Sequence, residues 1–246
     1  GVALGNLGGR LYERGALSDA LHHYQRSLDV LKQVGDRRSA GVMLAHIGQV
    51  EQELGRYEAA RSKLVEALGI QREVGDRAWE GIVLGMLGNV DLEQDQPDLA
   101  AEHFRQSVLT LTGSSYRRNA GLSLASLGMA ESLSGRPDAS RRAFERATEI
   151  LCEVGSASDR EACELLQLGS ELGARDGQTR ERAERRYASV ASRAGVLPDE
   201  VRFWLRILRR LLDREPVDAV EAAVWDRVRQ AAQDFRKFLD ATGLSG

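Results

Sequence analysis

Residues 1–8 read GVALGNLG, and the same segment returns as GVMLAHIG at 41–48, GIVLGMLG at 81–88 and GLSLASLG at 121–128. Glycine opens and closes every copy, so the segment repeats with a period of forty residues. A fixed period of this size indicates a repeat array, in which each unit buries its apolar face only against its neighbours. Such arrays expose long, regular surfaces, and the pattern therefore predicts a binding protein.

Each unit contains two helical patterns separated by a turn. In the second unit, Val42, Leu44 and Ile47 recur at helical spacing before Gly55 breaks the pattern, and a second helical run follows. Gly75-Asp76 ends that run, because glycine suits the left-handed cap of one helix and aspartate caps the start of the next. No segment shows the alternation typical of a strand. We therefore expect an all-α fold of antiparallel helix pairs.

A column of glycines in the first helices predicts where the two helices of a pair cross. Glycine inside a helix costs about 1 kcal/mol relative to alanine, so its recurrence at one spacing needs a reason. Close approach of a bulky side chain from the second helix is the physical reason that we expect. The glycines are Gly8, Gly48, Gly88 and Gly128, and the bulky partners are Tyr24, Leu64, Phe104 and Phe144.

These columns resemble the tetratricopeptide repeat, which has small residues in its first helix and alanine, an aromatic residue and alanine in its second. The forty-residue period and the Val-Gly-Asp-Arg linkers at 34–37 and 74–77 are similar to the variant in kinesin light chains, Leu-Gly-Asn adaptors and bacterial regulators. The resemblance is strong over residues 1 to about 154 and weak over 158–194. It implies a right-handed superhelical solenoid whose first helices line the concave face.

The chain departs from that family in two places. Where the family usually has an aromatic residue, three residues after the mid-helix glycine, this chain has Leu11, Glu51, Asp91 and Glu131. The third linker, residues 113–117, lacks the Gly-Asp-Arg sequence, and we expect a looser or differently angled junction there.

The period divides the chain into a repeat array at residues 1–194 and a C-terminal helical cap at 195–246. The units of the array are 1–40, 41–80, 81–120, 121–157 and 158–194. Within the cap, we expect residues 199–213 to form an almost uniformly apolar helix that must be covered. Either the array and the last helix cover it, or a second molecule does so through Phe203 and Trp204.

Composition excludes several classes of partner. A formal net charge of −3 with 29% charged residues gives no electrostatic case for nucleic acid or an anionic membrane surface. No apolar run is long enough to span a membrane and no signal peptide opens the chain, so we expect a cytoplasmic protein. Because Gly1 lies inside the repeat pattern, we interpret the chain as a segment or a trimmed form of a longer protein. Its preference for arginine over lysine suggests a bacterial source. We interpret Cys152 and Cys163 as small buried residues of a reducing compartment.

The sequence contains no recognisable catalytic motif. The histidines lack a second ligand at metal-binding spacing, and the glycines are spread through helices instead of forming a phosphate-binding loop. No nucleophile elbow or cysteine–histidine signature is present. We therefore expect neither an enzyme nor a cofactor or metal site.

The resemblance places a set of polar and aromatic columns in the concave groove. Glu13, Glu53 and Glu93 share one column and form an acidic ladder that favours a basic, extended ligand. The alternative is that these glutamates are simply solvated, since charges about 10 Å apart in water repel by only about 0.4 kcal/mol. The candidate peptide-binding residues are Asn6, Tyr12, Glu13, His46, Gln49, Glu53, Met86, Asn89, Glu93 and Met129.

Three functions are consistent with this pattern. The first is a protein-interaction scaffold that binds a peptide, a protein segment or part of its own parent chain in the groove. The second is a module for self-association as a homodimer. The third is an accessory region that regulates an ATPase or kinase domain outside this segment, which rests on analogy with bacterial regulators alone.

Overall fold

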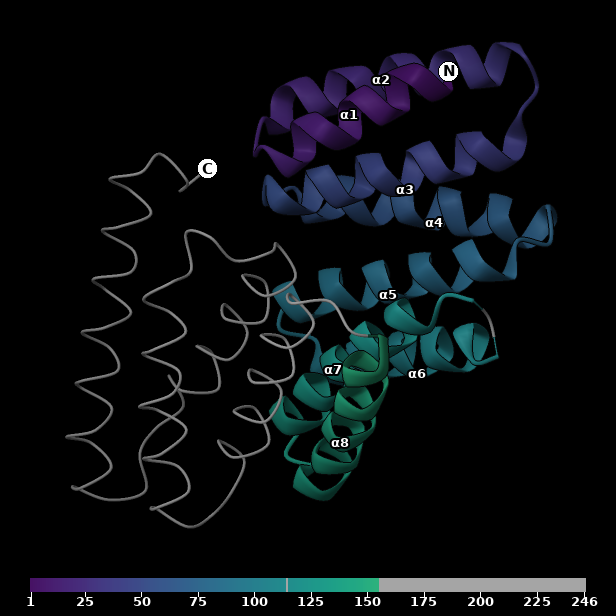
Figure 1. The fold of residues 1–246 in the computed structure, drawn as a ribbon. Helices are drawn as coiled ribbons and strands as arrows, with labels where there is room; N and C mark the ends of the chain where they lie inside the picture. Colours follow the sequence, from purple (N-terminus) through teal and green to yellow (C-terminus); the bar gives the residue numbers. More distant parts are fainter. Residues whose placement is uncertain (114, 155–246) are drawn as a thin grey trace. The chain divides into compact units, whose positions relative to one another are not determined.

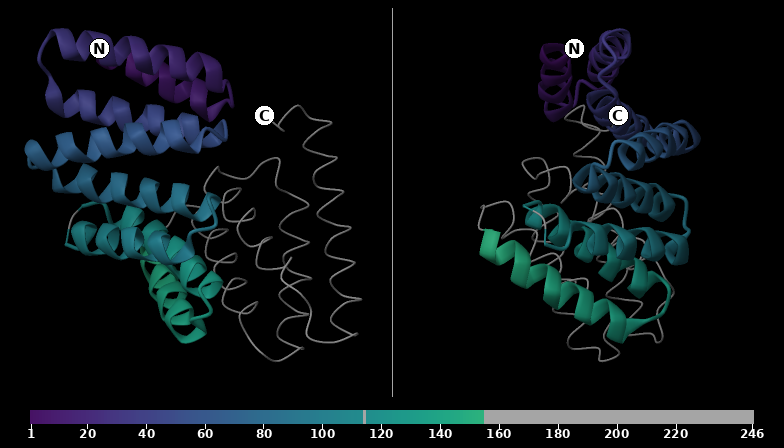
Figure 2. Two further views of the ribbon diagram at one scale, coloured as in Figure 1. Left: turned by 180° about the vertical axis from the view of Figure 1, so that it is seen from behind. Right: turned by 90° about the vertical axis from the view of Figure 1, so that its right-hand side faces the viewer.

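A computed structural model of the chain describes residues 1–113 and 115–154. These residues form eight α-helices and no strand, which confirms the all-α prediction for this part of the chain. Figure 1 shows α1 to α6 as three pairs that follow one another in chain order, and Figure 2 shows the same pairs from two further sides. The helices are α1 (Val2–Glu13), α2 (Leu17–Gln33), α3 (Arg37–Glu53), α4 (Tyr57–Glu73), α5 (Arg77–Glu93), α6 (Pro97–Leu111), α7 (Arg117–Leu133) and α8 (Pro137–Val154).

The first two linkers between pairs end one helix and start the next within three residues. After α2, Gly35 adopts a φ of 75°, and the amide of Asp36 donates to the carbonyl of Leu31 at 3.0 Å. This is the left-handed cap that glycine allows without steric cost. The Asp36 carboxylate then accepts from the amide of Ser39 at 3.0 Å and caps α3, and Asp76 caps α5 in the same way. The predicted glycine and aspartate caps are therefore confirmed.

The glycine column marks the helix crossings. A Cβ atom built on Gly88 would lie 2.7 Å from Cε1 of Phe104, and one built on Gly128 would lie 2.7 Å from Cδ1 of Phe144. Because real Cβ atoms do not approach so closely, only glycine lets α5 and α6, and α7 and α8, pack at these distances. Gly8 and Gly48 contact Tyr24 and Leu64 in the same manner, so all four predicted crossings are confirmed.

Serine and alanine alternate at a buried position of the second helices. Ser27 and Ser107 are fully buried, and their hydroxyls donate to the carbonyls of Gly1 at 2.8 Å and Gly81 at 2.7 Å. Ala67 and Ala147 occupy the equivalent positions and are also fully buried. The small side chain is required by packing, while the hydroxyl adds a hydrogen bond only in the first and third repeats.

The third linker differs from the other two, as its sequence predicts. Helix α6 ends at Leu111, and Thr112 is extended with a ψ of 129°, whereas Val34 and Val74 are helical at the ends of α2 and α4. The chain divides at this linker into two compact units, Gly1–Tyr116 and Arg117–Gly246. Three helix pairs lie in the first unit, and α7 and α8 are the described part of the second.

One expectation about the cysteines is wrong. Cys152 is exposed on α8 instead of buried, and its repeat position explains why. Lys32, Arg72 and Thr112 occupy that position in the other repeats, and all three are exposed. Cys163, the fifth unit at 158–194 and the C-terminal cap at 195–246 lie outside the described residues.

Candidate protein-binding surface

We call the compact unit Gly1–Tyr116 the first unit. Its predicted groove residues lie on the first helices of its three pairs, where spacings of three and four residues place side chains on one face. On α1, Asn6 and Glu13 are exposed. The remaining seven predicted residues of this unit are half-buried, so they are packed at one side and accessible at the other. They are Tyr12 on α1, His46, Gln49 and Glu53 on α3, and Met86, Asn89 and Glu93 on α5.

Met129, the predicted groove residue on α7, has a different environment. Its exposed fraction is 0%, so the structure does not offer this side chain to a ligand. Ser126, which precedes it by three residues on the same helix, is also buried. The candidate surface is therefore confined to α1, α3 and α5 of the first unit.

A row of aromatic rings crosses the three repeats of that unit. The ring of His46 on α3 stacks on Tyr24 of α2, with centroids 5.2 Å apart and planes 13° apart. His46 also meets Trp79 of α5 nearly edge to face, at 5.5 Å and 84°. Both geometries are favourable for rings that carry a quadrupole. His46 was predicted from its repeat column, but Trp79 was not, because it lies in the first turn of α5 and outside the repeated columns.

Burial sets the charge state of this row. Desolvation lowers the pKa of His46 below its usual value, against a smaller opposing effect from its hydrogen bond with Gln49, so the ring is neutral at pH 7. Burial also raises the pKa of Tyr24 to about 12, and the nearby charge of Glu13 adds to the increase.

The acidic ladder is only partly available. Glu13 is exposed, but Glu53 and Glu93 are half-buried and each already interacts with another group of the protein. On the same face, the side-chain oxygen of Asn89 is buried without a hydrogen-bond partner among the described residues. An unsatisfied polar atom of this kind costs about 1–3 kcal/mol, which a donor from a ligand would recover.

A second acidic column lies inside the helix pairs, at the positions where the related family usually has an aromatic residue. Glu51 pairs with Arg56 at 3.1 Å, and Glu131 pairs with Arg136, in each case five residues later in the turn. In the third repeat the residue at this position of the turn is Gln96, so Asp91 has no local arginine. Its partners come from other helices.

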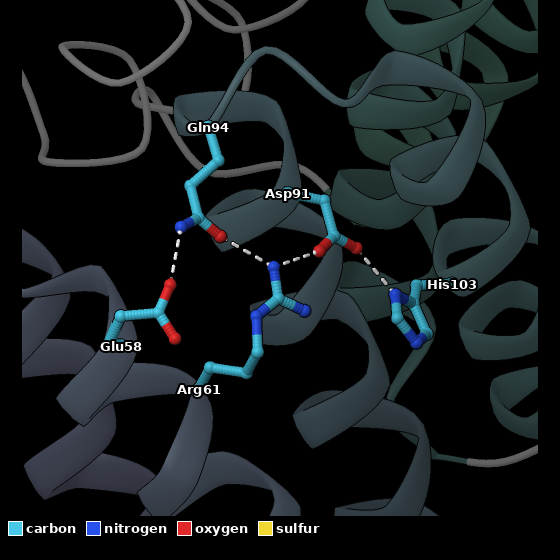
Figure 3. Close-up of polar contacts among 5 residues, drawn as sticks. All are labelled: Glu58, Arg61, Asp91, Gln94 and His103. Carbon is cyan, nitrogen blue, oxygen red and sulfur yellow. Dashed lines mark hydrogen bonds and ion pairs between the residues drawn. The ribbon is translucent and has the colours of Figure 1, made fainter.

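Asp91 is fully buried, with an exposed fraction of 0%, and is held from two sides (Figure 3). Arg61 of α4 donates to its Oδ1 at 2.7 Å, and Nδ1 of His103 on α6 lies 2.5 Å from its Oδ2. Arg61 also donates to the side-chain oxygen of Gln94 at 2.6 Å, and Gln94 donates to Glu58 at 3.0 Å. We call these five residues the Asp91 cluster.

The Asp91 cluster joins two repeats. Glu58 and Arg61 belong to α4 of the second repeat, and the other members belong to α5, its following turn and α6 of the third. A buried carboxylate is tolerated only when it is paired and hydrogen-bonded, and Arg61 and His103 supply both conditions. The cluster therefore fixes the packing between α4 and α5 beneath the candidate surface. The sequence pointed to it only through the missing aromatic residue and the replacement of arginine by Gln96.

The arginines at the N-terminal ends of the first helices form ion pairs within the protein. Arg37 of α3 pairs with Glu73 of α4 within one helix pair, and Arg117 of α7 pairs with Glu153 of α8 in the equivalent way. Arg38 lies 3.4 Å from Asp76, the cap of α5. Such pairs at the surface contribute little stability, but they neutralise part of the positive charge at this edge.

Two other kinds of site were sought among the described residues. No group of three or more histidine, cysteine, aspartate or glutamate side chains is arranged there to hold a metal ion. None of the helices that the structure describes is long and apolar enough to cross a membrane. Phe203 and Trp204, the predicted interface residues, lie outside the described residues.

The fold is similar to solved repeat structures. One is the apo form of RapI, with a TM-score of 0.67 and 14% identity over 95% of this chain and 83% of that one. Another is a Podosopora anserina kinesin light chain with nearly identical TPR-like repeats, with a TM-score of 0.59 and 14% identity over 77% of this chain and 92% of that one. These likenesses confirm the all-α repeat solenoid. No curated protein matches the sequence.

The sequence itself matches two family models, both described as tetratricopeptide repeat. One covers residues 2–34, which hold α1 and α2, and the other covers residues 39–108, which hold most of α3 to α6. The matches fall on the helix pairs whose glycine crossings and capped linkers are described above. Over these residues the chain belongs to the tetratricopeptide repeat family.

Proposed function

We propose that the first unit binds an extended segment of another protein, or of its own parent chain, across α1, α3 and α5. Tetratricopeptide repeats support the broader role of a protein-interaction scaffold. The observation that carries the finer proposal is the regular set of polar and aromatic side chains on the three first helices, which are exposed or half-buried on α1 and half-buried on α3 and α5. Binding without catalysis is part of this proposal.

The spacing of the repeats favours an extended ligand. Packed helices lie about 8–10 Å apart, and an extended strand advances about 3.3 Å per residue, so each repeat would meet about every third ligand residue. Glu13, Glu53 and Glu93 favour basic side chains at those positions. Asn6, Gln49 and Asn89 add amides that can hydrogen-bond a ligand backbone or its amide side chains.

A pair of labelled peptides tests this spacing. In one, arginine occupies every third position between glycine and serine, and in the other the same arginines are adjacent. We expect the spaced peptide to bind the full chain more tightly in a fluorescence anisotropy titration. Equal affinity for the two isomers would show that only net charge is recognised, and no binding of either would refute the proposal.

Charge variants locate the binding surface. The triple variant Glu13→Lys, Glu53→Lys and Glu93→Lys should abolish binding with unchanged helicity by circular dichroism, and the milder triple change to glutamine should weaken it. The matched control reverses three exposed acids on the second helices, Asp29, Glu66 and Glu102, and changes net charge equally. If the control loses as much affinity as the test variant, the first helices are not the binding surface.

Two further functions stay predictions. Self-association through residues 199–213 and regulation of a domain outside this segment both depend on parts of the protein beyond the described residues. Sedimentation of the intact chain separates the first from peptide binding, because a monomer that binds the spaced peptide needs no second copy.

A further inference from the structure

The candidate surface has two chemically different margins. On α1, α3 and α5, the helix face that ends in a glutamate begins with an aliphatic residue. Val2 is 63% exposed, and Val42 and Ile82 are half-buried. We call Val2, Val42 and Ile82 the aliphatic column, and Glu13, Glu53 and Glu93 the acidic column. Each glutamate follows the aliphatic residue of its helix by eleven positions, which is about 16 Å along the helix axis.

Two rings extend the apolar margin in the second and third repeats. Trp79 precedes Ile82 by three positions on α5 and meets His46 of α3, with ring centroids 5.5 Å apart. Both rings are half-buried and leave part of their surface accessible. Because burial lowers the pKa of His46, its ring is neutral at pH 7. One margin of the surface therefore offers uncharged side chains, and the opposite margin offers carboxylates.

Amide side chains lie between the two margins. Gln49 and Asn89 occupy the same repeat position there, and the side-chain oxygen of Asn89 is buried without a hydrogen-bond partner among the described residues. This acceptor favours a ligand whose backbone N–H groups are free to donate. A helix uses those groups internally, whereas a polyproline II segment makes no internal hydrogen bonds and leaves them available.

The spacing of the repeats distinguishes two extended conformations of the ligand. Each repeat meets about every third ligand residue, because packed helices lie about 8–10 Å apart. Side chains of a β-strand alternate between two sides, so residues three apart would face opposite margins in successive repeats. A polyproline II helix completes one turn in three residues and about 9 Å, so residues three apart face the same margin. Only this conformation directs one kind of side chain to the acidic column in every repeat.

We infer that the bound segment is a polyproline II helix with apolar residues along one side and basic residues along another, each at every third position. The apolar side contacts the aliphatic column and the rings of His46 and Trp79, and the basic side contacts the acidic column. Glu53 and Glu93 already interact within the protein, but a carboxylate accepts several hydrogen bonds and can bind a further cation. The inference rests on the proposed function and adds to it the conformation and the apolar residues of the ligand.

Two labelled peptides of identical composition test the conformation. One repeats Leu-Pro-Arg four times, and proline both fixes its own φ and favours an extended backbone at the preceding leucine. The other has the same sequence with D-proline, whose inverted φ is incompatible with the left-handed polyproline II helix. We expect the L-proline peptide to bind the full chain at least about tenfold more tightly in fluorescence anisotropy, because only it is preorganised to reach both margins. Equal affinity for the two peptides would overturn the inference.

A double variant tests the apolar margin. Val42→Thr with Ile82→Thr adds hydroxyl groups to the aliphatic column and should weaken binding of the L-proline peptide at least about threefold, because less apolar surface is buried. The spaced arginine peptide of glycine and serine carries no apolar side and should bind this variant as before. The matched control is Val65→Thr with Leu109→Thr, on the second helices of the same two repeats, where the side chains are 55% and 76% exposed.

Circular dichroism checks that both double variants keep the helicity of the original chain. No loss of affinity in the Val42 and Ile82 variant, or an equal loss in the control, would overturn the inference. An equal loss for the spaced arginine peptide would also overturn it, because the aliphatic column would then not be specific for apolar residues. In each case, tighter binding of spaced than of adjacent arginines by the original chain would leave the proposed function standing.

Discussion

The second and third repeats have the same scaffold and solve the same packing problem with different side chains. Both begin with a seventeen-residue helix that an aspartate caps, and both cross their second helix at a glycine. In the second repeat Glu51 pairs with Arg56 within one turn. In the third, Asp91 reaches Arg61 of the preceding repeat and His103 of α6. The period thus fixes the helices, while the polar contacts are specific to each repeat.

This difference changes how much each ion pair contributes to the stability of the fold. The Glu51–Arg56 pair is local, and 59% of the Arg56 side chain is exposed, so water competes for its charge. The Asp91–Arg61 pair joins two repeats, with the aspartate 0% and the arginine 26% exposed. A local pair can break without moving the helices, whereas loss of the cross-repeat pair leaves a poorly solvated arginine between α4 and α5. The third repeat should therefore be more sensitive to mutation than the second.

The largest effect should come from the glycine crossing of the third repeat. Gly88→Val places side-chain atoms where Phe104 already lies, since even a Cβ would be 2.7 Å from its ring. We expect overpacking to reduce the free energy of unfolding by about 3 kcal/mol. The same substitution at Gly69, a helical glycine of α4 with nothing within 4 Å, should cause no loss. Urea denaturation measures both, and an unchanged midpoint for Gly88→Val would show that this crossing is not tight.

The Asp91 cluster should give the next largest effect. Asp91→Ala removes the carboxylate that neutralises Arg61, and we expect a loss of about 2 kcal/mol, somewhat below that for a fully buried pair because Arg61 can partly reach water. Glu51→Ala, the same change at the equivalent position, should cost less than about 1 kcal/mol. Equal losses in urea denaturation would refute the distinction between local and cross-repeat pairs.

A transplant of the local pair sharpens this comparison. The variant Asp91→Glu with Gln96→Arg gives the third repeat the residues that the second has at Glu51 and Arg56. If the local pair can replace the cross-repeat pair, Arg61→Met should cost clearly less in this background than in the original chain. A double-mutant cycle measures the difference. If Arg61→Met lowers stability equally in both backgrounds, Arg61 acts through Gln94 or through packing and not through the carboxylate.

The fold was predictable because the sequence repeats its packing. Gly48 and Gly88, with Leu64 and Phe104, recur at fixed positions, and a glycine inside a helix has few explanations other than close approach. The glycine and aspartate linkers were equally clear, because left-handed caps and N-caps each favour few residue types. The change at the third linker also followed from its sequence, since residues 113–117 contain a glycine but not the Gly-Asp-Arg sequence of the other linkers.

The contacts of the candidate surface were only partly predictable. His46 and Asn89 followed from their columns, but Trp79 is unique to the third repeat and no period points to it. Asp91 was recognisable in the sequence because it replaces the aromatic residue that is usual in the family. Its partners Arg61 and His103 were not predictable, because they lie on other helices and follow no local spacing. Met129 was predicted to line the groove because it occupies the equivalent position of its repeat, but its side chain is buried. Repeat periodicity predicts position, whereas accessibility depends on neighbours that differ between repeats.

A smaller, pH-dependent effect should distinguish His46 from Met86, its equivalent in the third repeat. Because the pKa of His46 is lowered in the folded state, the unfolded chain binds a proton more readily than the folded one. This residue therefore contributes stability above its ordinary pKa near 6.5, and that stability is lost as the pH falls through the folded value. His46→Met should remove this loss. Stability measured by urea denaturation across the acid range tests it, and an identical acid dependence in the variant would contradict the assignment.

The smallest effect should lie at the turn inside the third pair. Gly15, Gly55 and Gly135 adopt a positive φ at this position, but the third repeat has Asp95 there, with a φ of 58°. A residue with a Cβ is strained in this conformation, less so for aspartate than for most, so Asp95→Gly should raise stability by about 0.5–1 kcal/mol. The reciprocal change Gly55→Asp should lower it by a similar amount, because nothing lies within 4 Å of a Cβ at Gly55 and only the backbone opposes the substitution. Thermal unfolding of the two variants gives opposite signs if the turn is equivalent in both repeats. If Asp95→Gly is instead destabilising, the aspartate makes a contact in solution that outweighs its backbone strain, and the third turn is specialised like the Asp91 cluster beside it.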